Sequence, residues 1–120
     1  MDPYELDTFT RAYAEAALWS SLDENGTQLD EYLSLTEIAP ETLEQMLEDC
    51  RDFCEANAEL LAQAGDDERN GHDFWLTRNR HGAGFWDRGY GPAGDALTKA
   101  AHVYGSLYLY LGDDGKVHQS

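Results

Sequence analysis

The feature of this sequence that most constrains its fold is a helical pattern of apolar residues between Pro40 and about Ala64. Apolar side chains recur there at intervals of three and four residues, which places them along one side of an α-helix. Proline is well tolerated at the first position of a helix, so Pro40 predicts where this segment starts. The pattern therefore predicts one amphipathic helix about 37 Å long. Its members are Leu43, Met46, Leu47, Cys50, Phe53, Cys54, Asn57, Leu60, Leu61 and Ala64.

Weaker signals predict a helix before this segment and a linker after it. Residues 7–21 repeat aromatic and small residues at helical spacing, with Asp7 or Thr8 available as the N-cap. Ser34 and Glu37 have the spacing of a capping box ahead of a single short turn. The polar stretch GDDERNG, residues 65–71, predicts the linker that ends the long helix.

Beyond residue 71 the hydrophobic period changes from helical to alternating. Residues 72–78 and 83–88 are rich in aromatics and flank the turn sequence Asn-Arg-His-Gly at 79–82. This arrangement predicts a β-hairpin with a tight turn. Residues 89–94 contain three glycines and a proline, which is typical of a loop.

The C-terminal quarter predicts one more helix and a second hairpin. Asp95 can cap a short helix that Gly105 ends. The stretch SLYLYL, residues 106–111, alternates Leu with Tyr and is followed by an Asp114-Gly115 turn, as in a strand that pairs with a short last strand. The order α-(α)-α-β-β-α-β-β predicts an α+β fold in which N-terminal helices, one of them long and acidic, pack on a small antiparallel sheet.

The chain has 120 residues, and that length predicts a single domain, 1–120, with its own core. No apolar stretch is long enough for a membrane span, and the N-terminus MDPYELDTF does not have the basic and apolar regions of a signal peptide. Cys50 and Cys54 lie four residues apart in the expected helix, where a disulfide is geometrically unfavourable. We therefore expect free thiols and a cytoplasmic protein.

The formal net charge of −16 is confined to one part of the chain. Residues 1–70 form an acidic helical half with 19 acidic side chains and three arginines, which accounts for the whole −16. Residues 71–120 form a neutral half with five acidic and five basic side chains. Binding to nucleic-acid phosphates requires lysines and arginines, so nucleic acid is not an expected ligand. A basic partner is the more natural expectation.

One side of the long helix is lined by carboxylates at successive intervals of three or four residues. Six of them extend over about 27 Å of helix axis. Like charges at this spacing destabilise a helix by about 0.2 to 0.5 kcal/mol per pair, or about 1 to 2.5 kcal/mol for five pairs. Only Arg51 relieves the repulsion. The six are Glu41, Glu44, Glu48, Asp52, Glu55 and Glu59.

Two interpretations fit this acidic face. It is either a solvated surface that keeps the protein soluble, or an imitation of the phosphate row of a nucleic acid that docks into a basic groove. In the second interpretation four further carboxylates, Asp23, Glu24, Asp30 and Glu31, extend the binding surface.

A different hypothesis places chemistry in the expected first hairpin. His72, Asp73, His81 and Asp87 are residue types that ligate metals or transfer protons. However, the sequence contains no HExxH, paired CxxC, EF-hand or GxSxG motif, and the Gly-Ala-Gly at 82–84 has neither the lysine nor the following helix of a phosphate loop. We therefore expect neither a metal nor a cofactor, and treat a small hydrolase or metal enzyme as the alternative.

The aromatic residues of the same hairpin support a third hypothesis. Phe74, Trp75, Phe85 and Trp86 can pack as cross-strand pairs, with Arg78 and Arg88 pairing with Asp73 and Asp87. Strand alternation would leave part of this set exposed as a contact patch for a protein partner. The residues of that patch are Trp75, Trp86, Arg78, Arg80 and His81.

Three stretches of the chain are distinctive when taken together: FTRAYAEAALWSS at 9–21, IAPETLEQMLEDCRDFCEANAELL at 38–61, and HDFWLTRNRHGAGFWDRGYG at 72–91 with LYLYLGDDGKV following. Together they resemble a family of small acidic proteins encoded by tailed bacteriophages and prophages. Where the family has glycine in the turn, this chain has Arg80, which is disfavoured at a positive φ.

The resemblance implies a setting in a bacterial host cell and carries no catalytic residues over. Small acidic phage proteins often inhibit host defence systems by imitating nucleic acid, as anti-CRISPR and anti-restriction proteins do. The leading hypothesis is thus a non-enzymatic inhibitor of a basic host protein or ribonucleoprotein. A phage regulatory or assembly module that uses the aromatic patch, and the small enzyme, are the alternatives.

Overall fold

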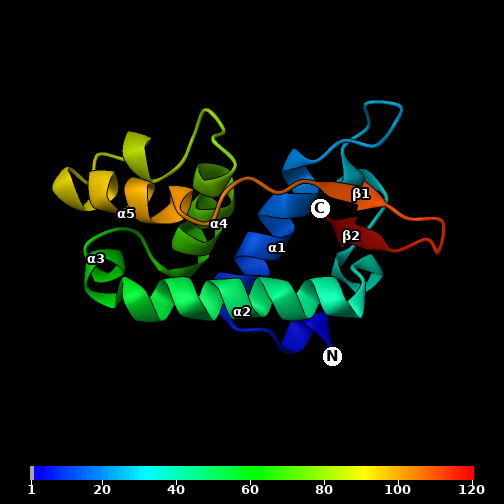
Figure 1. Ribbon diagram of the computed structural model, residues 1–120, viewed down its shortest axis with the longest axis horizontal. Coiled ribbons are helices and arrows are strands. Elements are labelled where there is room, and N and C mark those ends of the chain that lie inside the picture. The colour runs from blue at the N-terminus through cyan, green and yellow to red at the C-terminus, as the bar shows by residue number, and fades with distance from the viewer. Residues whose placement is uncertain (1) are drawn as a thin grey trace.

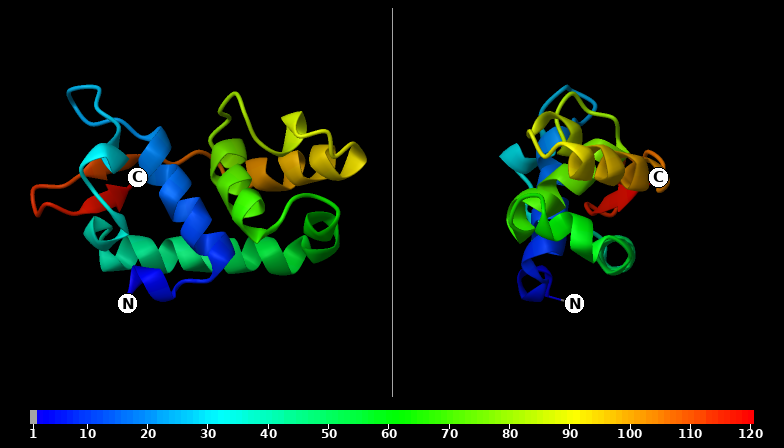
Figure 2. Two further views of the ribbon diagram at one scale, coloured as in Figure 1. Left: turned by 180° about the vertical axis from the view of Figure 1, so that it is seen from behind. Right: turned by 90° about the vertical axis from the view of Figure 1, so that its left-hand side faces the viewer.

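The long acidic helix α2 (Pro40–Ala56) forms the base of the molecule, and the other helices lie on it (Figure 1). The computed structural model describes residues 2–120. Helices α1 and α4 stand side by side across α2, with α3 and α5 towards one end and the β1–β2 hairpin at the other, as the reverse view confirms (Figure 2). The further elements are α1 (Thr8–Ser20), α3 (Ala58–Ala62), α4 (Asp67–Arg78), α5 (Pro92–His102), β1 (Leu109–Leu111), β2 (Val117–Gln119), and 3₁₀ helices at Pro3–Glu5, Leu29–Glu31, Leu35–Glu37 and Phe85–Asp87.

The N-terminal half follows the sequence prediction closely. Helix α1 is confirmed, and Ser34 and Glu37 form a capping box on a 3₁₀ turn. Pro40 occupies the first turn of α2. The prediction of a single helix that reaches Ala64 is wrong in one respect. Asn57 leaves helical geometry with φ −126° and separates α2 from α3.

The predicted first β-hairpin is wrong. Residues 67–78 form α4, and the polar stretch expected to be a linker contains its start: Asp66 accepts a hydrogen bond from the Arg69 backbone N–H at 2.9 Å and caps the helix. Almost every residue of α4 from Asn70 onward is buried, so the helix has no polar face to reveal its period. The alternation among its aromatics therefore has the pattern of a strand although the segment is a helix.

Close packing of α4 on α1 depends on a glycine. A Cβ on Gly71 would lie 2.0 Å from the carbonyl oxygen of Phe9, so no other residue allows this approach of the two helices. The helix then ends at the predicted turn. Arg80 adopts φ 57° and donates its N–H to Thr77, while His81 donates to Leu76, which together form a Schellman motif.

The segment after α4 is a loop with one 3₁₀ turn rather than a second strand. Gly84, at φ 154°, lies against Thr77, and the next residue, Phe85, donates its N–H to the Thr77 hydroxyl at 3.1 Å. Helix α5 begins at Pro92, inside the stretch predicted to be a loop. Trp86 is left on the surface with 52% of its area exposed.

The second hairpin is confirmed, and so is the α+β class with helices preceding a small antiparallel sheet. Strands β1 and β2 pair antiparallel, with Leu109 opposite Gln119 and Leu111 opposite Val117. Of the expected inward face, Leu109 is buried whereas Leu111 is 41% exposed. On the other side of β2, the Ala39 N–H donates to Val117 at 2.9 Å, which joins the hairpin to the start of α2.

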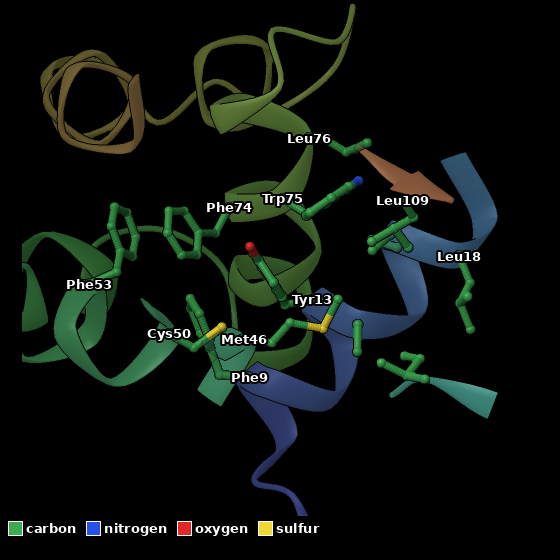
Figure 3. Packing of buried hydrophobic residues seen from close by; sticks show 14 of the residues in the cluster. Phe9, Tyr13, Leu18, Met46, Cys50, Phe53, Phe74, Trp75, Leu76 and Leu109 are labelled. Carbon is green, nitrogen blue, oxygen red and sulfur yellow. The ribbon is translucent and has the colours of Figure 1, made fainter. Parts of the chain in front are cut away.

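One hydrophobic cluster draws residues from both the acidic and the neutral half of the chain. At its centre the rings of Phe53 from α2 and Phe74 from α4 stack at 4.0 Å, and Tyr13 from α1 packs on Phe74 at 5.2 Å (Figure 3). Trp75, expected at the surface, is 1% exposed and donates its indole N–H to the Ser20 hydroxyl at 2.8 Å. Among residues 2–120, no helix combines the length and apolar character that a membrane crossing requires.

Arg78 is a buried cation that joins four segments. Its guanidinium donates to the Tyr13 hydroxyl at 3.0 Å, to Asp49 at 2.9 Å, and to the carbonyl oxygens of Tyr104 and Gly105 at 2.9 Å each. All three guanidinium nitrogens therefore donate hydrogen bonds and Asp49 balances the charge, as a buried arginine requires. The sequence analysis predicted that Arg78 pairs with Asp73 or Asp87. An acidic partner is present, but it is Asp49.

Candidate functional site

The exposed side of α2 carries the predicted acidic face. Its opposite side is anchored in the core by Leu43, Met46, Cys50 and Phe53, which fixes the outward direction of the carboxylates. Five predicted members lie on α2 and the sixth, Glu59, lies on α3 beyond the interruption at Asn57. All six are exposed: Glu41, Glu44, Glu48, Asp52, Glu55 and Glu59.

Three acidic residues of α2 have partners elsewhere in the protein. Asp49 turns towards Arg78, Asp52 accepts a hydrogen bond from the Tyr104 hydroxyl, and Glu41 lies 3.8 Å from His118 Nδ1. Burial and the hydrogen bond to Asp52 raise the pKa of Tyr104, so this hydroxyl remains a donor. Of the six, the carboxylates left free for a partner within the described residues 2–120 are thus Glu44, Glu48, Glu55 and Glu59. The first three border a shallow hollow together with Leu47, Arg51 and Asp52.

The second predicted acidic group lies elsewhere. The loop that carries Asp23 and Glu24 projects from the edge of the molecule opposite α2 (Figures 1 and 2). Glu24, Asp30 and Glu31 are exposed. Asp23 instead organises its own turn: hydrogen bonds from the Thr27 N–H and the Tyr32 hydroxyl lower its pKa. The structure does not bring these four residues and the α2 face into one continuous strip.

The protein neutralises several of its few cations internally. Arg11 pairs with Glu15 at 3.3 Å, Arg78 with Asp49 at 2.9 Å, and Arg88 with Asp73 at 2.9 Å. Arg51 is the one arginine among the exposed acidic side chains of α2. It makes no ion pair within the described residues 2–120.

The aromatic contact patch predicted for the first hairpin does not exist as a surface. Trp75 and Arg78 are 1% and 3% exposed and belong to the core, because the segment that carries them is a helix. Only Trp86, Arg80 and His81 of the predicted set remain at the surface.

The residues considered for chemistry are partly brought together. Asp73 is buried and is held by Arg88 Nη2 at 2.9 Å and Nε at 3.3 Å, with His72 Nδ1 at 3.8 Å. Asp87 caps the 3₁₀ turn at Gly84, and His81 lies exposed beyond the end of α4. In the part of the chain that the structure describes, no three His, Cys, Asp or Glu side chains are placed to hold a metal ion.

The thiols are free and shielded. Cys50 is buried and Cys54 half-buried on the inner side of α2. Burial raises the pKa of Cys54 to about 12 and raises that of Cys50 well above its ordinary value. Both therefore stay protonated at neutral pH and pack as small apolar groups.

A groove between α1 and α4 was not foreseen from the sequence. It is a hollow of ≈ 450 Å³ between the middle of α1, the first turns of α4 and the loop before α5. The spacing of Arg69 and His72 is the one signal of this groove in the sequence, but the polar stretch at residues 65–71 predicts a linker there. The lining residues of this α1–α4 groove are Ala12, Glu15, Asp66, Glu68, Arg69, His72 and Arg88.

No protein-family model, curated protein or solved structure matches this chain. The geometry defines a helix-rich α+β protein with an acidic outer helix face.

Proposed function

We propose that this protein is a non-enzymatic, phage-encoded inhibitor that occupies a basic nucleic-acid-binding surface of a host defence protein through α2. The observation that carries the proposal is the exposed row of carboxylates on a helix whose opposite side is locked into the core. The resemblance to small acidic phage proteins supports the biological setting.

The energetics support a use for this row beyond solubility. Mixing lysine with glutamate at the same positions would keep the surface soluble and would add favourable pairs at i, i+4. Instead, the carboxylates along α2 repel one another, and the ion-paired arginines lie elsewhere: on α1, in the core and in the loop before α5. A rigid row of like charge is the arrangement that attracts a basic groove from a distance.

The charge of the row also defines how binding should respond to salt. Association driven by such a field is fast at low ionic strength and weakens as salt screens it within about 10 Å at 0.1 M. We expect the complex to be released by moderate salt and by duplex DNA, because DNA competes for the same basic surface.

The test is a matched pair of charge-reversed variants. One carries Glu44→Lys, Glu48→Lys and Glu55→Lys on α2; Asp52 is spared because it holds Tyr104. The other carries Glu24→Lys, Asp30→Lys and Glu31→Lys. Each set replaces three exposed carboxylates and changes the net charge by the same amount.

Each protein is immobilised and used to capture proteins from a bacterial lysate, with elution by salt and by duplex DNA. We expect the natural chain and the Glu24 set to retain a DNA-binding protein that DNA displaces, and the α2 set to lose it. Equal retention by both variants, or capture that duplex DNA does not displace, would contradict the proposal.

A further inference from the structure

The α1–α4 groove gathers three cationic or proton-donating side chains in a strongly acidic protein. Arg69 and His72 come from α4, one turn apart, and Arg88 comes from the loop before α5. Of the remaining lining residues only Ala12 is uncharged. The α2 acidic face shares no residue with this groove.

Each of the three retains a nitrogen with no partner within the described residues 2–120. Arg88 uses Nε and Nη2 on Asp73, which leaves Nη1. His72 turns Nδ1 towards Asp73, which leaves Nε2, and its ring packs on Trp19 at 5.8 Å. Arg69 makes no ion pair, although its backbone N–H is used by the Asp66 cap.

Two of the three carboxylates in the groove are already engaged. Glu15 pairs with Arg11 at 3.3 Å, and Asp66 accepts the Arg69 N–H at the start of α4. Glu68 is the one lining carboxylate for which the described residues provide no partner. Glu15 and Asp66 each keep one oxygen without a partner in the described part of the chain, so four carboxylate oxygens of the groove face the five guanidinium N–H groups of Arg69 and the two of Arg88 Nη1.

The buried Asp73 holds two of the donors in place. Its carboxylate has no exposed area, and both oxygens bind Arg88, so the guanidinium is fixed at the groove wall. Gly65 makes room for the Arg69 stem, since a Cβ there would lie 2.8 Å from the Arg69 Cδ. Preorganised donors of this kind bind oxyanions through charge-assisted hydrogen bonds.

We propose that the α1–α4 groove is a binding site for a phosphate group, held between Arg69, His72 Nε2 and Arg88 Nη1. The phosphate comes either from the free ion or from a small phosphomonoester, whose organic part would then lie towards Trp19 beside His72. The site is independent of the proposed binding through α2.

The experiment is a titration of the whole protein with sodium phosphate at constant pH and ionic strength, followed by the ring ¹⁵N resonances of its four histidines. We expect a saturable shift at His72, while His81, His102 and His118, which do not line the groove, stay in place. Parallel shifts at all four histidines, or a shift that does not saturate, would show an adventitious ion only and overturn the proposal.

Three variants test the geometry. Arg69→Gln, at an exposed position, is expected to weaken phosphate binding about tenfold through loss of a charge-assisted contact. Glu68→Gln should tighten binding because it removes the free carboxylate, and Arg80→Gln, outside the groove, should leave it unchanged. Equal phosphate affinities of the Arg69→Gln and Arg80→Gln proteins would contradict the assignment.

Adenosine monophosphate is titrated in parallel to separate the two sources. Equal affinity for both ligands assigns the site to the phosphate group alone. Tighter binding of the nucleotide, with a shift of the Trp19 indole resonance, assigns it to a phosphomonoester with a planar ring.

Discussion

Arg80 has a backbone conformation that its side chain does not favour. It occupies the position after the α4 C-cap at φ 57°, in a Schellman motif whose hydrogen bonds to Thr77 and Leu76 are both formed. Glycine is the common residue at this position because it has no Cβ. The turn therefore keeps its hydrogen-bonded geometry although the positive φ of Arg80 is conformationally unfavourable and lowers the stability of the fold.

We expect Arg80→Gly to stabilise the protein by about 1 kcal/mol, because glycine removes the left-handed strain while the hydrogen bonds remain. Urea denaturation of the natural chain and the variant measures the difference. Arg80→Ala is the control, since it removes the same charge but keeps the Cβ. Equal stability of the two variants would contradict the explanation.

Asp73 is the residue whose ionisation matters most for the α1–α4 groove. Burial by itself raises its pKa, but the contact with His72 and the pairing with Arg88 outweigh burial and leave the pKa below its ordinary value. A carboxylate with a lowered pKa in the folded state stabilises the protein above its unfolded pKa of about 3.9. That contribution disappears as the pH falls through the lowered value.

Asp73→Asn should consequently cost about 2 kcal/mol at pH 7, because Arg88 loses its charged partner. The difference in stability should begin to narrow as the pH falls below about 4 and should close only below the lowered folded-state pKa of Asp73. Denaturation curves across this pH range provide the measurement, with the exposed Asp113→Asn as a control of unchanged stability. A gap between the two proteins that persists in acid would refute this account of Asp73.

At the scale of the elements, the contact between α1 and α4 is the most sensitive in the molecule. Gly71 is the point of closest approach, and a methyl group there would overlap the Phe9 carbonyl. Both elements are helices fixed in the same core, so neither can move away without disturbing the packing of Tyr13 and Phe74.

Gly71→Ala is therefore expected to destabilise the protein by about 3 kcal/mol or more. Gly82→Ala is the matched control: it lies in the loop after α4, a Cβ there meets nothing within 4 Å, and its φ is not positive. Its expected effect is within about 0.5 kcal/mol. Thermal unfolding of both variants measures the difference in stability. Similar melting temperatures would contradict the close packing of α4 on α1 at Gly71.

The elements that the sequence predicted correctly are those with one solvent-exposed face and one buried face. Helix α2 alternates buried Met46 and Phe53 with exposed Glu44 and Glu48, so its period is visible in the chain. Helix α4 is buried nearly all round from Asn70 onward, so its period is hidden there, and its start is visible only if Asp66 is recognised as a cap rather than as part of a linker.

The same distinction applies to the sites. The acidic face of α2 could be read from residue spacing because it lies on one helix. The α1–α4 groove could not, because Arg88 reaches it from a separate loop and Glu15 from another helix. Its composition depends on the crossing of α1 and α4, which no local pattern encodes.

For the molecule as a whole, net charge is the dominant property. A formal charge of −16 lies within principal extents of 43 × 29 × 21 Å. At 0.01 M salt the screening length is about 30 Å, so charges across the whole protein repel one another. At 1 M it is about 3 Å, and most of that repulsion is removed.

Raising sodium chloride from 0.01 M to 1 M should thus increase the melting temperature by at least about 4 °C. The α2 variant with three lysines has a net charge of −10 (−16 + 6) and should gain less. Differential scanning calorimetry of the two proteins provides the comparison. An equal or larger gain in the variant would mean that self-repulsion is not the origin of the salt effect.

The contacts of Arg78 also have a consequence for the order of folding. Two of its partners, Tyr13 and Asp49, precede it in the chain, while the carbonyls of Tyr104 and Gly105 follow it after α5. A chain that ends before Tyr104 has to bury a guanidinium with two of its donors unmatched. The segment after α5 is thus a requirement for closing the helical core, and folding of α1, α2 and α4 is coupled to residues that are synthesised after all three helices.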